Sequence, residues 1–288
     1  MEYLINLSIL LCIYSILGLS LNMVVGMTGL LSLAQAAFYG IGAYACALGM
    51  TALGMNFFTS ILLGMVVNAV LAFVVGKILS QFKGDYYAIV SAGLSIIVFS
   101  VLLNWKGVTN GPIGIFGIPK PEIASFAFSS STSFLSLSLG LAALVFVLFK
   151  WLDKSSFGRA LKAIREDEEL AQVMGYKTRS YKSIIFVLSA MLSGMAGALF
   201  ASYIAFIDPF TFTLHEGIFL FTIIILGGLS DAWGSVLGAV ILLSLPEALR
   251  FLGLSYEHSA QIQKMIYGGA LVAIIAFRPK GILGKYKM

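Results

Sequence analysis

Charged residues are scarce in this sequence. Asp, Glu, Lys and Arg make up 11% of the 288 residues, whereas 59% are hydrophobic and the mean hydropathy is +0.98. Soluble domains carry about 25% charged residues, so this composition excludes a soluble enzyme, a disordered chain and, despite a pI of about 9.1, a nucleic-acid-binding protein. The hydrophobic residues suffice for roughly eight or nine transmembrane helices of about 20 residues each. We therefore expect an all-α protein, a polytopic transmembrane helical bundle.

Cysteine and histidine are also rare. The two cysteines, Cys12 and Cys46, lie inside apolar runs, which predicts small buried side chains and neither a disulfide framework nor a metal site. The two histidines, His215 and His258, are too far apart in the sequence to suggest a metal pair. No metal and no cofactor are therefore expected. The first residues carry no positive charge and no cleavage site follows, so the first apolar run is expected to be a retained helix.

Long uncharged runs predict where the chain crosses the membrane. No charge occurs between Glu2 and Lys77, and one helix of that length would be several times longer than a bilayer core is thick. The run must turn back, and glycines mark the turns. The nine expected crossings are 4–25, 31–50, 57–76, 86–105, 134–150, 183–207, 217–229, 233–250 and 259–277. A Gly-, Pro- and Ser-rich loop is expected at 109–133, and broken or re-entrant helices remain open near 26–33 and after residue 208.

The distribution of Lys and Arg predicts the orientation. Of the 18 such residues, 14 fall in the connections 77–85 and 150–182 and in the C-terminal tail. The connections at 106–133 and 250–264 hold the other four. Because cytoplasmic connections carry the excess of positive charge, the first group is predicted to be cytoplasmic. Nine crossings with the N-terminus outside and the C-terminus inside satisfy every assignment.

The cytoplasmic connection contains an unusual charged stretch. We treat residues 1–288 as a single transmembrane domain that contains a cytoplasmic segment at 152–182. A helix is expected over 156–175, from a possible serine cap to a terminal glycine. It combines the five consecutive charges of 165–169 with an apolar ridge made of Phe157, Leu161, Ile164, Ala171 and Met174. Two interpretations stay open: a helix lying flat on the bilayer, or a docking helix for a soluble partner.

The residues of this stretch and others resemble a known family. The run from Glu169 to Gly175 resembles the E-A-A-x-x-x-G loop of bacterial ABC importer permeases, with Leu170 in place of the second-position alanine and Val187-Leu188 where Leu-Pro is expected. Longer blocks resemble the branched-chain amino-acid importer permeases, specifically the M-type of the two permease subunits. They are Leu21–Tyr44, Gly84–Val90, Gly158–Asp167, Leu226–Leu229 and Arg278–Gly281.

The resemblance implies a function and a set of partners. It implies a permease working by alternating access with a second homologous permease, two cytoplasmic ABC ATPase subunits and an extracytoplasmic substrate-binding protein. The location would be a bacterial or archaeal plasma membrane. The chain has no G-x-x-x-x-G-K-[ST] phosphate loop, so it is not expected to be an enzyme itself. The resemblance also makes residues 1–288 a single permease domain and residues 152–182 its cytoplasmic coupling segment. The implied ATPase-coupling residues are Arg165, Glu166, Glu169, Ala171 and Gly175.

Polar and glycine residues inside two apolar segments are candidates for the substrate path. A zwitterionic substrate needs hydroxyls, amides, backbone groups or helix ends while it crosses. The candidates are Gly26, Thr28, Gly29, Ser32, Gln35, Tyr39, Gly227 and Gly228. Tight helix packing through small residues explains the glycines equally well. For Asn22, Asn68, Asn104 and Ser91, hydrogen bonds between helices are the expected role.

Two other functions remain as alternatives. Related permeases carry urea or short amides, and the sequence does not separate these substrates from amino acids. A stand-alone secondary carrier or channel is a second alternative, but a proton-coupled carrier normally needs an ionisable group in mid-membrane, and the predicted spans carry none. An intramembrane enzyme is disfavoured because the spans hold no nucleophile–base pair.

Overall fold

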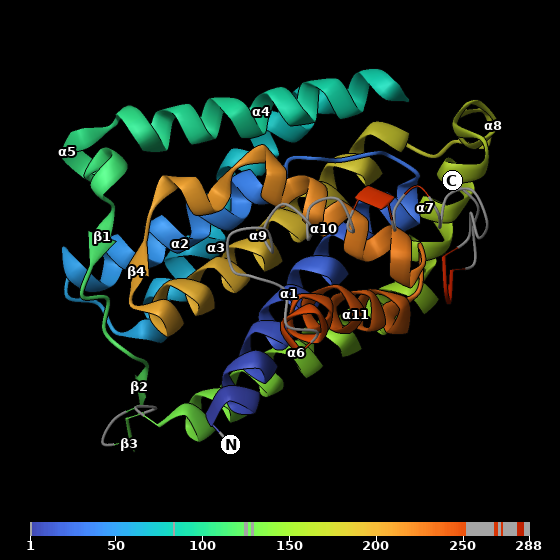
Figure 1. Cartoon of the computed structure of the whole chain (residues 1–288). Helices are drawn as coiled ribbons and strands as arrows, with labels where there is room; N and C mark the ends of the chain where they lie inside the picture. Colours follow the sequence, from blue (N-terminus) through green and yellow to red (C-terminus); the bar gives the residue numbers. More distant parts are fainter. Residues whose placement is uncertain are drawn as a thin grey trace.

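Helices form nearly all of the regular structure in this computed structural model, which describes residues 2–82, 84–123, 126–127, 130–251, 268–269, 272 and 281–284 (Figure 1). The long helices are α1 (Glu2–Thr28), α2 (Gln35–Thr51), α3 (Phe57–Leu79), α4 (Asp85–Asn104), α6 (Ser131–Lys154), α9 (Thr178–Ile204), α10 (Leu214–Gly227) and α11 (Ala232–Phe251). The short elements are α5 (Lys106–Thr109), η1 (Gly111–Ile113), β1 (Ile115–Phe116), β2 (Glu122–Ile123), β3 (Phe126–Ala127), α7 (Ser156–Glu166), α8 (Glu168–Val173), β4 (Phe206–Ile207) and η2 (Pro209–Phe212).

The predicted all-α transmembrane fold is confirmed. Helices α1, α2, α3, α4, α6 and α9 coincide with the first six expected crossings. Within the described residues, five helices are long and apolar enough to cross a membrane, and α10 with α11 adds a sixth if this bent pair is one span. Helix α2 is shorter, at 17 residues. The chain is therefore a multi-pass membrane protein, and its count of eight or nine crossings is approximate.

The last two described long helices form a bent pair. Helices α10 and α11 meet at an angle of 119° across a break of four residues or fewer. The turn contains Gly228 at φ +123° and Ser230 at φ +61°, a backbone that an uninterrupted helix does not contain. The pair is therefore a broken span or a re-entrant loop, the two possibilities that the sequence left open. The expected crossing at 259–277 lies outside the described residues apart from positions 268–269 and 272.

Local sequence signals account for several helix ends. The side chain of Asn56 accepts a hydrogen bond from the backbone N–H of Thr59 (3.0 Å) and begins α3. Ser130 does the same for α6, and Ser155 does so for α7. Such caps satisfy N–H groups that have no partner inside the helix. Turn chemistry and hydropathy therefore agree on where these elements begin.

Three helices, α1, α2 and α9, form the centre of the bundle. In the most apolar part of α9, 72% of residues are buried, and in α1 56%, against 22–28% for α3, α4 and α6. Helix α9 packs against α2 and α3 as well as α1. The outer helices α3 and α4 expose many large apolar side chains such as Val70, Ile89 and Ile97, as lipid-facing helices do.

The two ends of the bundle differ. Helices α7 and α8 lie together at one end, whereas α5 and the short strands β1 to β4 lie at the opposite end (Figure 1). Strand β1 pairs with β4 and β2 with β3, both antiparallel. The connections that carry most of the described Lys and Arg therefore gather at the α7–α8 end. The described part of the expected loop at 109–133 lies at the opposite end (Figure 1), and α6 already begins at Ser131.

Candidate functional site

The coupling segment is built from two helices rather than one. The sequence analysis expected a single helix over 156–175, but the structure has α7 and α8 with a break at Asp167. The backbone of Asp167 is extended (φ −152°, ψ 105°), and its carboxylate accepts hydrogen bonds from the N–H groups of Glu169 and Leu170, both at 3.0 Å. Aspartate is a strong helix N-cap, so it starts a second helix here, and the prediction of one continuous helix was wrong.

Two ion pairs fasten this segment to the neighbouring spans. Lys162 of α7 lies 2.5 Å from the carboxylate of Asp153 at the end of α6. Glu168 of α8 lies 2.6 Å from the ammonium of Lys182 in α9, whose side chain is only 4% exposed. A buried ion pair holds its partners in a defined geometry, because either charge left alone is costly. The segment is thus joined at both ends to membrane-spanning helices.

The five predicted coupling residues separate into two groups. Glu166 and Glu169 are exposed, and Gly175 is exposed at φ +88° with open space around it. Ala171, by contrast, is 2% exposed and lies on the inner face of α8. Arg165 also turns inward: its guanidinium donates a hydrogen bond to the backbone carbonyl of Gly26 at the end of α1.

The outer face of α8 is apolar, which the sequence analysis missed. Leu170, Val173 and Met174 are 51%, 85% and 67% exposed. Because the expected helix ran straight through Asp167, the predicted apolar ridge contained Met174 but not the other two. The start of a new helix at Asp167 changes which residues share a face. The signal was the Asp-Glu-Glu run, which is typical of a helix N-terminus.

The first predicted path segment is a tightly packed break between α1 and α2. Thr28 closes α1 by donating to the carbonyl of Val24 (2.7 Å). The side chain of Gln35 donates to Ser20 at 2.5 Å and accepts from Ser189 at 3.3 Å. Within the described structure, two other candidates of this segment lack such hydrogen bonds. The buried hydroxyls of Ser32 and Tyr39 have no hydrogen-bond partner among the described residues.

Most glycines in these segments allow close packing. A Cβ on Gly26 would lie 2.6 Å from the backbone nitrogen of Ser230, and one on Gly227 would lie 1.8 Å from the carbonyl oxygen of Gly234. Gly29 differs, because its φ is +72° and the nearest atom to an added Cβ is the side-chain Cγ of Arg165, at 3.0 Å. The alternative of packing through small residues therefore describes Gly26 and Gly227.

Asn22 is the polar centre that joins the two predicted path segments. It is fully buried in α1, and its amide nitrogen donates to Gly228 O (3.3 Å), Asp231 O (3.1 Å) and Ser235 Oγ (2.7 Å). Its amide oxygen accepts from the backbone N–H of Ser230 (2.8 Å). One side chain of α1 thus contacts residues 228, 230, 231 and 235 of the turn between α10 and α11 and the start of α11. The expected role in bonding between helices is confirmed for Asn22.

Hydrogen bonds between helices were also expected for three other polar residues of the spans, and two of the three join neighbouring elements. Asn68 of α3 donates to the carbonyl of Phe38 in α2 at 2.9 Å. Ser91 of α4 accepts from the N–H of Leu33 at 3.0 Å. Asn104 instead bonds within its own helix, to the carbonyl of Ser100. The first two therefore join neighbouring elements, whereas the expectation for Asn104 was wrong.

The turn between α10 and α11 has two further attachments. The N–H groups of Ile282 and Leu283 donate to the carbonyls of Leu226 and Gly227 at 3.0 and 2.9 Å. The carboxylate of Asp231 lies 3.9 Å from the ammonium of Lys150 at the end of α6. The turn is therefore held by α1, by α6 and by a segment close to the C-terminus.

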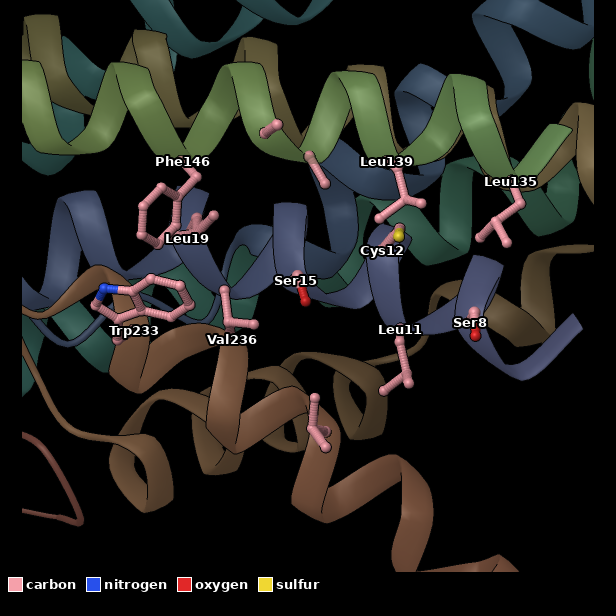
Figure 2. Close-up of a pocket in the computed structure, with 13 residues that line it drawn as sticks. Ser8, Leu11, Cys12, Ser15, Leu19, Leu135, Leu139, Phe146, Trp233 and Val236 are labelled. Carbon is pink, nitrogen blue, oxygen red and sulfur yellow. The ribbon is translucent and has the colours of Figure 1, made fainter. Parts of the chain in front are cut away.

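A cavity of about 520 Å³ lies beside this region, between α1, α6 and α11. Figure 2 shows side chains of the three helices converging on it, with Phe146 and Trp233 at one end and Leu135 and Ser8 at the other. The described residues of the lining are largely apolar, and none of them is charged. None of the predicted path residues lines it. Its chemistry suits hydrocarbon better than the charged ends of an amino acid.

Comparisons with known proteins agree with this architecture. The chain matches the family described as "Branched-chain amino acid transport system / permease component" over residues 3–275. It is 36% identical to the high-affinity branched-chain amino acid transport system permease protein LivM of Salmonella typhimurium, over 94% of this chain and 68% of LivM. Identity to LivM of Escherichia coli is 35%, over 97% and 69%.

A second permease type is similar to the chain at greater distance. The high-affinity branched-chain amino acid transport system permease protein LivH of Salmonella typhimurium is 26% identical, over 94% of this chain and 91% of LivH. The family match spans nearly all of the described helices, from α1 to α11. The chain is therefore a member of the family of branched-chain amino acid transport system permease components.

Proposed function

We propose that the chain is the transmembrane permease subunit of an ATP-binding-cassette importer for branched-chain or related hydrophobic amino acids. Its location would be the plasma membrane of a bacterium or archaeon. The family match and the names of LivM and LivH support the substrate class. Two relatives of different type in one organism support pairing with a second homologous permease. The missing phosphate-binding motif supports two separate ATPase subunits, and import supports an external substrate-binding protein.

The observation that carries the proposal is a continuous set of contacts from the coupling segment to the broken helix pair. Arg165 of α7 donates to the carbonyl of Gly26 at the end of α1. One turn earlier in α1, Asn22 holds the turn between α10 and α11. A displacement of α7 therefore acts on both predicted path segments. This is the arrangement that alternating access requires, because cytoplasmic movement must change the membrane path.

The outer face of α8 is the proposed contact with an ATPase subunit. The exposed apolar side chains of Leu170 and Val173 lie beside the exposed carboxylate of Glu169. An apolar patch with a charged rim is the usual composition of a protein–protein interface. The ion pairs of Lys162 and Lys182 join the segment to α6 and α9, so a displacement of the segment is transmitted to these two spans.

Uptake by reconstituted complexes tests the function. The permease with its partner subunits in proteoliposomes should import leucine only with ATP and the binding protein, and urea should not compete. Competition by urea at matched concentration would assign the chain to the amide-transporting branch. ATP-independent uptake by the permease alone would support a secondary carrier and contradict the proposal.

Two substitutions test the docking face. Val173→Asp places a charge on an 85% exposed apolar position of α8 and should release the ATPase subunits during purification. Ile113→Asp is the matched control, because Ile113 is 68% exposed at the opposite end of the bundle. Equal co-purification of the ATPases with both variants would contradict the docking role and leave α8 as a surface-lying helix.

A further inference from the structure

A groove of about 490 Å³ lies between the last turns of α3 and the first turns of α9. Its floor is the contact where the hydroxyl of Ser183 donates to the carbonyl of Gly76 at 3.4 Å. A Cβ on Gly76 would lie 3.1 Å from the ring of Phe186, so the two helices approach closely there. The groove opens away from this floor. Its described lining residues take no part in the ion pairs of the coupling segment or in the contacts of the turn between α10 and α11.

The walls of the groove carry two kinds of chemistry. Lys77 and Arg179 stand on opposite helices, with the hydroxyls of Ser180 and Ser183 beside Arg179. Phe73 and Ile184 are apolar and more than half exposed. None of the described residues that line the groove is acidic. The site therefore combines a positive polar end with an apolar wall.

The two cations are available to a ligand. Both side chains are exposed, and neither forms an ion pair with a carboxylate in the described part of the chain. The ammonium of Lys77 lies 4.3 Å from the centroid of the Phe73 ring, which holds it over the apolar wall. Two unpaired cations facing one groove attract an anion.

The position of the groove along the membrane normal fits a lipid headgroup. It lies at the end of the bundle predicted to be cytoplasmic. Tyr86 and Trp151, at the same end of α4 and α6, are 72% and 68% exposed, as in the aromatic belts at membrane–water interfaces. Along α3, the exposed face below Lys77 continues with apolar side chains, among them Val66 and Val70.

We propose that this groove binds the headgroup of an anionic phospholipid. The phosphate lies between Lys77 and Arg179 and accepts a hydrogen bond from the hydroxyl of Ser180. An acyl chain runs along Phe73 and Ile184 toward the membrane interior. Basic pockets between spans on the cytoplasmic side bind anionic headgroups in this way. The proposal requires only that the chain spans a membrane and does not depend on the transported substrate.

Native mass spectrometry of the purified complex tests the proposal. The probes are dioleoylphosphatidylglycerol and, as the neutral comparison, dioleoylphosphatidylcholine. The double variant Lys77→Gln/Arg179→Gln should weaken retention of the anionic lipid roughly ten- to thirtyfold and leave the neutral lipid unchanged. The matched control Lys154→Gln/Lys177→Gln removes the same charge from exposed residues at the same end that do not line the groove, and it should retain the lipid.

Further variants and a competition with inorganic phosphate identify the ligand and control for misfolding. The exchange variant Lys77→Arg/Arg179→Lys keeps both charges and should keep the lipid. Inorganic phosphate should not displace the lipid, whereas Ile184→Ser should weaken its retention. Equal loss in the double variant and its control, or displacement by phosphate alone, would overturn the proposal. Crosslinking of the groove to a second permease with no lipid retained would also overturn it, because the occupant would be protein.

Discussion

The substitution Asn22→Leu removes the side chain that joins the turn between α10 and α11 to α1. Leucine is similar in volume and satisfies none of the four hydrogen bonds that Asn22 makes. The N–H of Ser230, in a fully buried residue, would be left without a partner at a cost of about 1–3 kcal/mol. The two N–H groups of the Asn22 amide also lose their acceptors, and each such lost hydrogen bond between membrane helices adds about 0.6 kcal/mol on average.

Together these losses weaken the docking of the turn by about 2–4 kcal/mol. Even 2 kcal/mol corresponds to roughly a thirtyfold larger undocked population. A thiol introduced by Ser230→Cys, in a background without Cys12 and Cys46, reports on that population through its rate of reaction with maleimide. We expect the rate to rise at least tenfold in Asn22→Leu and transport to fall, with the permease still in the membrane.

Two companion variants sharpen this measurement. Asn104→Leu removes an exposed asparagine that bonds only within α4, so the labelling rate should not change. Asn22→Asp keeps an acceptor for Ser230 but points a carboxylate at the carbonyl oxygens of Gly228 and Asp231, and it should raise the rate as well. An Asn22→Leu protein that labels as slowly as its parent would refute the argument that this side chain holds the turn.

Four shorter predictions concern the coupling segment. A thiol from Ser155→Cys should react with an impermeant reagent only from the cytoplasmic side, and labelling from outside would overturn the orientation. Gly175→Val forces a β-branched residue to φ +88° at a cost of about 1–2 kcal/mol, and co-purification of the ATPases should fall; normal coupled uptake would contradict this. Gly29→Leu crowds the side chain of Arg165 and should abolish uptake in an assembled complex, whereas loss of expression would indicate a packing role only. Lys182→Met leaves the carboxylate of Glu168 without its cation and should destabilise the protein by about 3 kcal/mol; thermal unfolding should show partial recovery on adding Glu168→Gln, and an unchanged melting temperature would argue against the pair.

Much of the fold could be predicted along the chain. Expected crossings such as 57–76 and 86–105 coincide with α3 and α4 within a few residues, because hydropathy and glycine turns act locally. The break at Asp167 could have been predicted from the Asp-Glu-Glu run, since an aspartate before two glutamates is a helix start. The periodic apolar pattern was given more weight than the cap, and this is why two helices were predicted as one.

The candidate site was less accessible to sequence reasoning. The family motif located the coupling segment, but it did not indicate that Ala171 faces inward or that Arg165 turns toward α1. Those directions depend on which side of a short helix meets the bundle. Glycines that suggested a substrate path, such as Gly26 and Gly227, lie at close backbone contacts, and a glycine in the sequence has the same signature in either role.

The sequence by itself determined that this is a multi-pass membrane protein, where most of its helices lie and which family it belongs to. Each spanning helix satisfies its own backbone hydrogen bonds and must match the bilayer in length and polarity, so these properties can be read from consecutive residues. Only the tertiary structure decided that Asn22 meets Ser230 and Ser235, that Glu168 pairs with Lys182, and that Lys77 faces a groove with Arg179. These contacts join residues that are far apart in the chain, and the packing of whole helices, which no local pattern encodes, brings them together.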